Sequence, residues 1–245
     1  MRFDARTLAA GWLTVALASA DDKDRPILHR TILIEQHNTG LRLVATDSYK
    51  LLHTWVPYID DVASLAPDLD EAPIAEMIAV DPDRRCRALM AYLFASAGDP
   101  DDDDYEVTEA SVRFLSGAAL VADRISTDFD HTVSIETTGQ FPGMESTRII
   151  VEKPGQEKLT LNTIDAPFPH WRTMTTGALV KTDRVALNPT HLADIAKVKT
   201  WHPGSTWLWS FGGSDKPAHL ELHGSTPLIQ GLICPSRWPW AGDPA

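Results

Sequence analysis

Cysteine and positive charge are both scarce in this chain of 245 residues. Its two cysteines, Cys86 and Cys234, are too few for a disulfide framework or a multi-cysteine zinc site, and in reduced form they suit a cytoplasmic protein. Lys and Arg total 22 against 34 Asp and Glu, a formal net charge of −12. This balance excludes a surface that is basic throughout, while a locally basic face remains compatible with it.

Several motifs that define enzymes are also missing. The sequence has no Gly-x-Gly-x-x-Gly, no Walker A motif and no Gly-x-Ser-x-Gly elbow, so nucleotide binding and hydrolysis are unsupported. His219 and His223 lie four residues apart, and on a strand that spacing of about 13 Å is too wide for one zinc ion. Asp101 to Asp104 lack the glycine and the twelfth ligand of an EF-hand loop. We therefore expect a protein that is not an enzyme and holds no metal or cofactor.

The first 22 residues allow two interpretations. Arg2 and Arg6, the apolar run 8–18 and the Ala18-Ser19-Ala20 tripeptide resemble a signal peptide. Against this, Asp4 interrupts the basic stretch and is a good N-cap for apolar residues that recur at helical spacing. We favour a native helix and keep an exported binding protein as the alternative. Intact-mass measurement decides, because cleavage after Ala20 removes the helix. No run approaches the roughly 20 apolar residues of a membrane span.

A short strand, a capping residue and a helix recur three times along the chain. The order occurs at residues 2–5, at 78–83 with Asp81-Pro82, and at 185–190 with Asn188-Pro189. Asp and Asn are favoured N-caps, and proline at the first helical position loses no hydrogen bond. Strands follow these helices, which predicts an α+β fold of repeated βαβββ units.

The strands are expected where β-branched and aromatic residues gather between turn residues. Residues 31–35 and 41–46 form a predicted hairpin in which Gly40 supplies a positive φ. Further strands are predicted at 132–137, 148–151, 159–163, 206–211, 218–222 and 228–233. Segments 57–73 and 97–104 are interpreted as loops. Between Val107 and Ile125, apolar residues at intervals of three and four predict another helix.

Three segments resemble motifs of bacterial β sliding clamps, the processivity subunits of DNA polymerase III. Residues 41–51 end in Ala-Thr-Asp-Ser-Tyr-Lys-Leu, similar to the family's Ala-Thr-Asp-Gly-His-Arg-Leu. Residues 168–172, Phe-Pro-His-Trp-Arg, resemble Phe-Pro-Asp-Tyr-Arg, and residues 231–237, Gly-Leu-Ile-Cys-Pro-Ser-Arg, resemble the C-terminal Val-Met-Pro-Met-Arg-Leu. The three occur in family order. Ser48 stands where the family has glycine, and Cys234 and Ser236 where it has methionine.

The resemblance implies an α+β DNA clamp fold with helices on one face of curved antiparallel sheets. It also implies a cytoplasmic, non-enzymatic ring around double-stranded DNA that tethers a polymerase and meets a clamp loader through linear peptides. The chain begins where the family's middle domain begins, as in a shortened, phage-like clamp. The alternative is a monomeric clamp-like regulator or decoy that binds host replication proteins without encircling DNA.

Residue by residue, the resemblance implies a peptide-binding pocket made of Leu28, Thr46, Ser48, Tyr49, Lys50, Leu51, Pro169, Thr173, Met174, Leu232, Ile233, Cys234, Pro235, Ser236 and Arg237. A clamp needs only sequence-independent phosphate contacts on its inner helices. The basic residues expected on those helices are Arg6, Arg84, Arg85, Arg87, Arg113, Arg124, Lys197 and Lys199.

The domain organisation follows from the same units. We expect a clamp domain at 1–176 with two βαβββ units and an insertion at about 98–130, followed by a C-terminal domain or half-domain at 177–245. The family's rings contain six domains with two helices each. Four helices, beginning near Ala5, Asp83, Glu106 and Thr190, make two domains per chain. Three chains would then close a ring through head-to-tail contacts.

Overall fold

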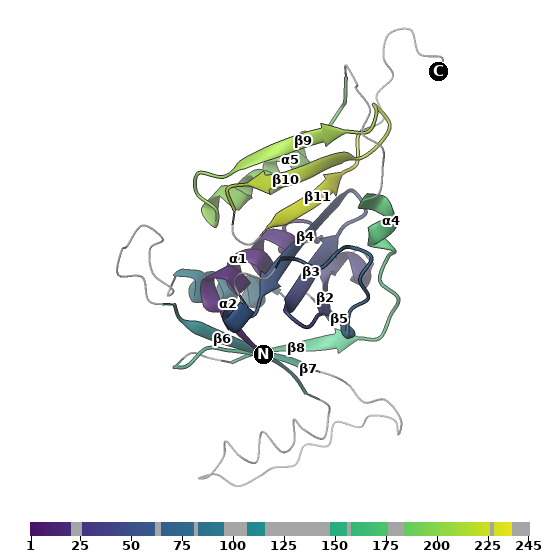
Figure 1. Ribbon diagram of the computed structural model, residues 1–245. Helices are drawn as coiled ribbons and strands as arrows, with labels where there is room; N and C mark the ends of the chain where they lie inside the picture. Colours follow the sequence, from purple (N-terminus) through teal and green to yellow (C-terminus); the bar gives the residue numbers. More distant parts are fainter. Residues whose placement is uncertain are drawn as a thin grey trace, which may run out of the picture.

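The computed structural model describes residues 1–20, 26–61, 65–80, 83–95, 107–115, 148–155, 158–175, 184–225 and 228–236. Within these ranges, helices α1 (Ala5–Ala16), α2 (Asp83–Ala95) and α5 (Pro189–Ala196) contribute to one buried core against an antiparallel sheet (Figure 1). The shorter helix α4 (Trp171–Thr175) packs into a second, separate cluster. No helix among the described residues is long and apolar enough to cross a bilayer.

The described strands form one eleven-stranded sheet in the order β1-β6-β7-β8-β5-β2-β3-β4-β11-β10-β9. Its strands are β1 (Arg2–Asp4), β2 (Thr31–Gln36), β3 (Gly40–Thr46), β4 (Lys50–Pro57), β5 (Ala75–Val80), β6 (Glu109–Leu115), β7 (Arg148–Glu152), β8 (Leu159–Ile164), β9 (Thr206–Phe211), β10 (Ala218–His223) and β11 (Ile229–Ile233). Short 3₁₀ turns are η1 (Ile27–Arg30), η2 (Ile59–Asp61) and η3 (Lys197–Thr200).

Two βαβββ units exchange their first strands. The first strand of one unit, β1, pairs with β6 of the other, and β5 of the second unit pairs with β2 of the first. A third unit of α5, β9, β10 and β11 joins the sheet where β11 pairs with β4. The repeated units predicted from the sequence are therefore confirmed, and the antiparallel α+β class with them.

The helix starts follow from their capping residues. Asp4 Oδ1 accepts a hydrogen bond from the Thr7 amide at 2.7 Å, and Asn188 Oδ1 accepts one from the Thr190 amide at 2.9 Å. Each side chain satisfies a main-chain donor that has no partner inside its helix. These two cap predictions are confirmed, and the third, at Asp81, lies outside the described residues. Helix α1 carries Trp12 and other fully buried residues and lies at the centre of the core.

Both faces of the central strands are covered, which explains why β3 and most of β4 are buried at every position. One face packs against α1 through Leu43 and Leu52. The other face, called here the outer face, carries a second buried cluster of Leu33, Val44, Leu51, Ile78, Trp171 and Leu232. Successive side chains of a strand point to opposite faces, so the two clusters share the same strands.

Three sequence predictions need correction. The helix expected at 107–125 is wrong over residues 109–115, which form β6, and residues 116–125 lie outside the described part. Ala110 and Val112 are buried while their neighbours Ser111 and Arg113 are not, a period of two that partial helical spacing concealed. Residues 184–188 form no strand. Gly40 does not have the positive φ expected of it.

Glycine is needed at position 40 because the main chain there lies close to the next strand. A Cβ at this position would lie 2.8 Å from the Trp55 ring and 2.9 Å from Pro57 Cα on β4. The hairpin itself is confirmed, with Gln36 opposite Leu41. The predicted strands 148–151, 159–163, 206–211, 218–222 and 228–233 are confirmed within a residue or two. The strand predicted at 132–137 and the loop predicted at 97–104 lie outside the described residues.

Candidate functional site

The turn between β3 and β4 is held by its own side chains. Asp47 Oδ1 accepts hydrogen bonds from the amides of Tyr49 and Lys50 at 2.9 and 2.7 Å. Thr46 Oγ1 accepts from the Ser48 amide at 3.1 Å and donates to the Lys50 carbonyl at 2.8 Å. Such Asx and hydroxyl bonds fix a turn without a regular ladder. The motif similar to Ala-Thr-Asp-Gly-His-Arg-Leu thus forms a rigid corner.

Ser48 has a φ of 75°, the only positive φ at a non-glycine residue in the described part of the chain. This is the position at which the related motif has glycine. The strain of a Cβ there costs roughly 1–2 kcal/mol. The Ser48 hydroxyl lies 2.8 Å from His29 Nε2, a hydrogen-bonded contact that offsets part of the cost.

We expect Ser48→Val to lower the free energy of unfolding by about 1–2 kcal/mol, because a β-branched side chain is strained at positive φ and the hydroxyl contact is lost. Ser48→Gly should be close to neutral, since relief of strain offsets the lost contact. Urea denaturation measures both, with Ser214→Val as an exposed control. Equal destabilisation by the valine and glycine variants would contradict this explanation.

The C-terminal segment joins this corner. Leu232 pairs with Leu51 and Ile233 with Lys50 in the β11–β4 ladder. Beyond the ladder, the Cys234 amide donates to the Tyr49 carbonyl at 2.8 Å. Burial, and then the charge of Asp47, raise the pKa of the Cys234 thiol, so the thiol stays protonated. The first and last motifs of the resemblance therefore lie side by side.

Lys50 ties the same corner to helix α5. Its buried Nζ lies 2.7 Å from Asp194 Oδ2 and 3.3 Å from Asp47 Oδ2. Burial alone would raise the pKa of Asp194, but hydrogen bonds from Lys50 and Lys197 outweigh it and lower the pKa. Tyr49 stacks on His191 of α5 with ring centroids 5.5 Å apart. These contacts orient α5 against the corner.

A buried charge network lies beside the apolar outer cluster. The fully buried Glu35 carboxylate accepts from Arg172 Nη2 at 2.7 Å and from Trp171 Nε1 at 3.2 Å, and Arg42 Nη1 lies 3.8 Å away. Arg172 Nε donates to the Leu69 carbonyl at 2.6 Å, and Arg42 Nη2 donates to the Pro67 carbonyl. This network, called here the Glu35 network, fixes α4 and residues 67–69 on the outer face.

The structure brings together most of the predicted peptide pocket. Leu28 and Phe168 pack against the outer cluster that contains Leu51 and Leu232, and Met174 of α4 is 48% exposed. Pro169, Thr173, Pro235 and Ser236 are at least partly exposed. Two predicted members point elsewhere: Ile233 is buried in the helix-side core, and Lys50 faces α5. Arg237 lies outside the described residues.

The predicted DNA-contacting residues divide into three groups. Arg6 lies on α1 over the Phe94 ring at 4.9 Å, and Lys197 and Lys199 lie in η3, directly after α5. Helices α1 and α2 pack together, and α5 shares their core. Arg84, Arg85 and Arg87 lie on α2, but their side chains are outside the described part, as is the whole of Arg124.

The placement of Arg113 on a helix is wrong. It lies on β6 between Val112 and Phe114, which pack into the helix-side core, and so its side chain points to the opposite face. There it forms an ion pair with Glu152 of β7. The physical reason is the strand period of two, under which an arginine between core residues faces away from the helices.

Sequence reasoning missed the Glu35 network. The sequence predicts Glu35 only as the end of a strand and Arg172 only as part of a motif. Trp171 and Arg172 are adjacent in the Phe-Pro-His-Trp-Arg segment. Both side chains are hydrogen-bond donors that cannot accept, so their adjacency indicates a nearby acceptor such as a carboxylate. Its partner, more than 130 residues away, follows only from the fold.

No family model and no curated protein matches the sequence. Solved structures do match it closely in fold. With its exchanged βαβββ units and the helices α1, α2 and α5 on one side of the sheet, the chain has the fold of the bacterial DNA polymerase sliding clamps. The fold implied by the three motifs is thereby confirmed.

Three solved neighbours illustrate the likeness. The DNA polymerase sliding clamp from Pseudomonas aeruginosa with ligand superimposes with a TM-score of 0.57 at 13% identity, over 97% of this chain and 66% of that chain. A putative DNA polymerase III beta subunit from Eubacterium rectale gives 0.56 at 9% identity over 96% and 64%. DNA polymerase III subunit beta from Borrelia burgdorferi gives 0.55 at 9% identity over 98% and 64%. The chain thus spans slightly less than two thirds of each neighbour.

Proposed function

We propose that this protein is a sliding clamp, a non-enzymatic processivity factor that encloses duplex DNA and tethers a DNA polymerase. The observation that carries the proposal is the sliding-clamp fold across 97% of the chain. A clamp binds DNA through its helices, and Arg6, Lys197 and Lys199 lie on or beside the helices that share one core. Such binding is independent of sequence and weakened by salt.

The polymerase would dock on the outer face through a linear peptide. The corner at 46–51, the C-terminal segment 232–236 and the 169–174 segment supply an apolar surface with main-chain groups nearby. Aliphatic or aromatic anchors of a peptide fit such a surface. A clamp loader would compete for the same place.

Substitutions at Pro235 and Met174 test the docking surface best, because Leu51 is buried and a charge there would unfold the protein. We expect Pro235→Asp and Met174→Asp each to weaken a fluorescein-labelled clamp-binding peptide at least about tenfold, about 1.4 kcal/mol. Fluorescence anisotropy measures the affinity, with Leu208→Asp on the exposed edge strand as control. Undiminished affinity in a folded variant would place the peptide elsewhere.

The oligomeric state distinguishes the clamp from the alternative function, a monomeric regulator of host replication proteins. The trimer expected from the sequence counted a helix beginning at Glu106, and the described residues 109–115 are a strand, so that count is wrong. We retain a head-to-tail ring as the proposal, with the trimer as its first candidate. Light scattering should give a mass near three times 27.0 kDa, or another closed multiple. A species that stays monomeric even with circular DNA would favour the regulator.

Retention on DNA gives a second, independent readout. Reversing Arg84, Arg85 and Lys197 to glutamate is expected to shorten retention on nicked circular duplex, because each removed cation contributes to the phosphate attraction. A matched triple reversal of Arg148, Lys158 and Lys216, which are at least partly exposed on and beside β7, β8 and β10, serves as control. Equal retention of the two triple variants would remove these residues from the DNA-binding face.

A further inference from the structure

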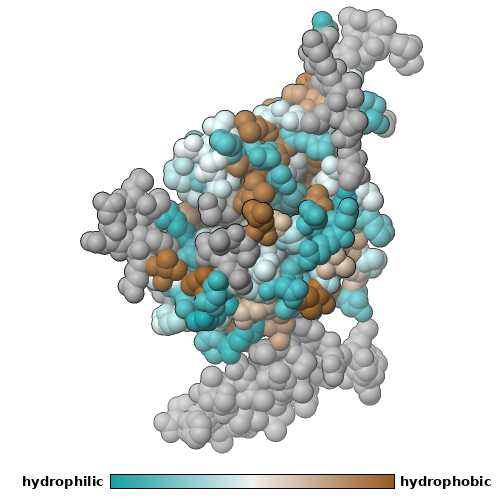
Figure 2. Space-filling model, viewed as in Figure 1, coloured by the Kyte–Doolittle hydropathy of each residue, from teal (hydrophilic) through white to brown (hydrophobic). Residues whose placement is uncertain are grey.

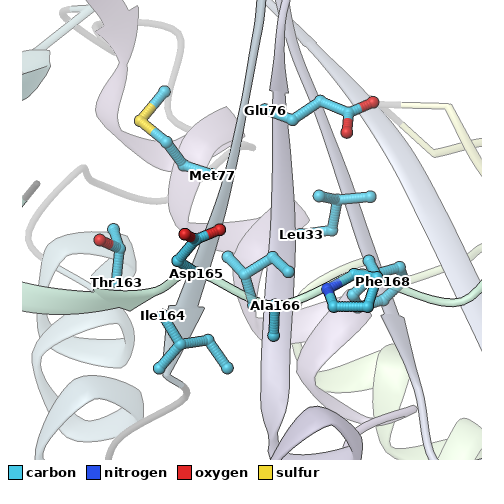
Figure 3. Close-up of a pocket in the computed structure, with 10 residues that line it drawn as sticks. Leu33, Glu76, Met77, Thr163, Ile164, Asp165, Ala166 and Phe168 are labelled. Carbon is cyan, nitrogen blue, oxygen red and sulfur yellow. The ribbon is translucent and has the colours of Figure 1, made fainter.

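A pocket of about 390 Å³ opens on the outer face where β5 and β8 separate (Figure 3). The two strands pair only at Ile78 with Ile164 and at Ala79 with Thr163. Beyond Ile164 the chain leaves the ladder, and Pro167 offers no amide to continue it. The fork between β5 and residues 165–168 therefore stays open instead of closing into a continuous sheet.

The floor of this fork is apolar. Leu33 and Ile78 belong to the buried outer cluster, and Ile164 and Phe168 are partly buried against it. Figure 3 shows the side chains of Leu33, Ile164 and Phe168 among those around the pocket. A volume of this size accepts one or two side chains of a ligand. None of the residues of the predicted peptide pocket lines it.

The rim carries negative charge. Glu76 and Asp165 are exposed lining residues, and no ion pair joins either of them to another described residue. None of the ten lining residues is basic. In the β5–β2 register Glu76 lies opposite Glu35. Glu35 already forms an ion pair with Arg172, whose Nη2 lies 2.7 Å from Glu35 Oε2. The rim is thus complementary to a cation, while the floor suits an apolar group.

The fork also presents a strand edge. Residues 75–77 of β5 pair with β2 on one side, and no described strand pairs with their other side. An unpaired edge accepts an extended peptide by strand addition, in which main-chain hydrogen bonds give affinity and side-chain pockets give specificity. On the outer face Glu76 and Ile78 are two residues apart, which matches the side-chain spacing of an added strand.

We propose that this fork binds an extended segment of a partner protein, with an aliphatic side chain on the Leu33–Phe168 floor and a Lys or Arg two residues away between Glu76 and Asp165. The site lies on the β5 side of the 165–175 segment, whereas the polymerase peptide of the proposed function would lie on the β4 and β11 side. The inference goes beyond that function and does not depend on it.

Two labelled heptapeptides test the proposal: Gly-Ser-Leu-Val-Lys-Ser-Gly and the same sequence with Glu in place of Lys. Fluorescence anisotropy should show the Lys peptide binding about tenfold more tightly, and about 0.5 M salt should reduce the difference. The double variant Glu76→Gln, Asp165→Asn should remove the preference. Its control, Asp215→Asn with Glu221→Gln, changes the same net charge on and beside β10 and should retain it.

A third variant tests the floor separately from the rim. Ala166→Trp fills the fork and should abolish binding of the Lys peptide, while Pro235→Asp should leave it unchanged. In ¹⁵N spectra of the wild-type chain, the shifts should concentrate at amides 75–77 and 163–168. Equal affinity for both peptides, or shifts confined to residues 46–51 and 232–236, would overturn the proposal. If Pro235→Asp loses the polymerase peptide but still binds the Lys peptide, the result tests the proposed function and leaves the fork proposal supported.

Discussion

Glu35→Leu is expected to lower the free energy of unfolding by about 3–5 kcal/mol, the range for breaking a buried ion pair from one side. Glu35 is fully buried, and its carboxylate is the shared partner of Arg42 and Arg172. Without it, two guanidiniums lie close together in a poorly solvated site, and Trp171 Nε1 loses its acceptor. Urea denaturation at pH 7 measures the loss.

The control is an exposed pair of the same kind. Glu109→Leu removes the partner of Arg2 at 3.1 Å, but both side chains are about half exposed, so the loss should stay below about 1 kcal/mol. A triple variant, Glu35→Leu with Arg42→Met and Arg172→Met, removes all the charges together. It should recover much of the stability lost by Glu35→Leu alone. A loss below 1 kcal/mol for Glu35→Leu would show that water reaches the network.

The same network explains why the outer face holds a defined shape on this side of the sheet. Arg42 and Arg172 reach the carbonyls of Pro67 and Leu69, so a segment without regular structure is fixed by guanidinium donors. Apolar and polar residues alternate in small areas on the face drawn in Figure 2, and no single broad apolar patch covers it. Segments held in this way therefore give this surface its local shape.

Local signals in the sequence predicted local structure well. Asp4 and Asn188 fix their helices through hydrogen bonds within three residues, and Gly40 marks a hairpin. The prediction for 109–115 is wrong because Val107, Ala110 and Phe114 fit helical spacing, whereas Ala110, Val112 and Phe114 fit strand alternation. Pairing with β1, more than 100 residues away, decides between them. A window of seven residues contains no information on that partner.

In the candidate site, too, the sequence predicts some features, whereas others follow only from the fold. The resemblance predicts Thr46, Leu51 and Leu232 in one pocket, and the β3–β4 and β4–β11 ladders place Thr46 and Leu232 on either side of Leu51. The resemblance does not indicate which face each side chain takes. It implies Ile233 and Lys50 as pocket members, but both point to the helix side. The fork at β5 had no sequence signal, because it arises from the place where two strands part.

We expect the free energy of unfolding to fall between pH 7 and pH 5, which is above the pH range in which carboxylates titrate. Burial, and then the charges of Arg42 and Arg172, lower the pKa of His53 to about 3, and burial lowers that of His202 to about 4. In the unfolded chain both titrate near 6.5, so the unfolded state binds more protons as the pH falls below that value. Stability present above pH 6.5 is therefore lost progressively toward pH 4.

Between pH 7 and pH 5 each of these two histidines should cost about 2 kcal/mol, or about 4 kcal/mol together. His37, whose pKa is lowered first by burial and then by Arg42, adds to the loss with the same sign. Urea denaturation at pH 7, 6 and 5 measures the slope. His53→Leu and His202→Leu should each remove about 2 kcal/mol of the pH-dependent loss. A free energy of unfolding that stays constant from pH 7 to pH 5 would mean that these imidazoles accept protons within the folded protein.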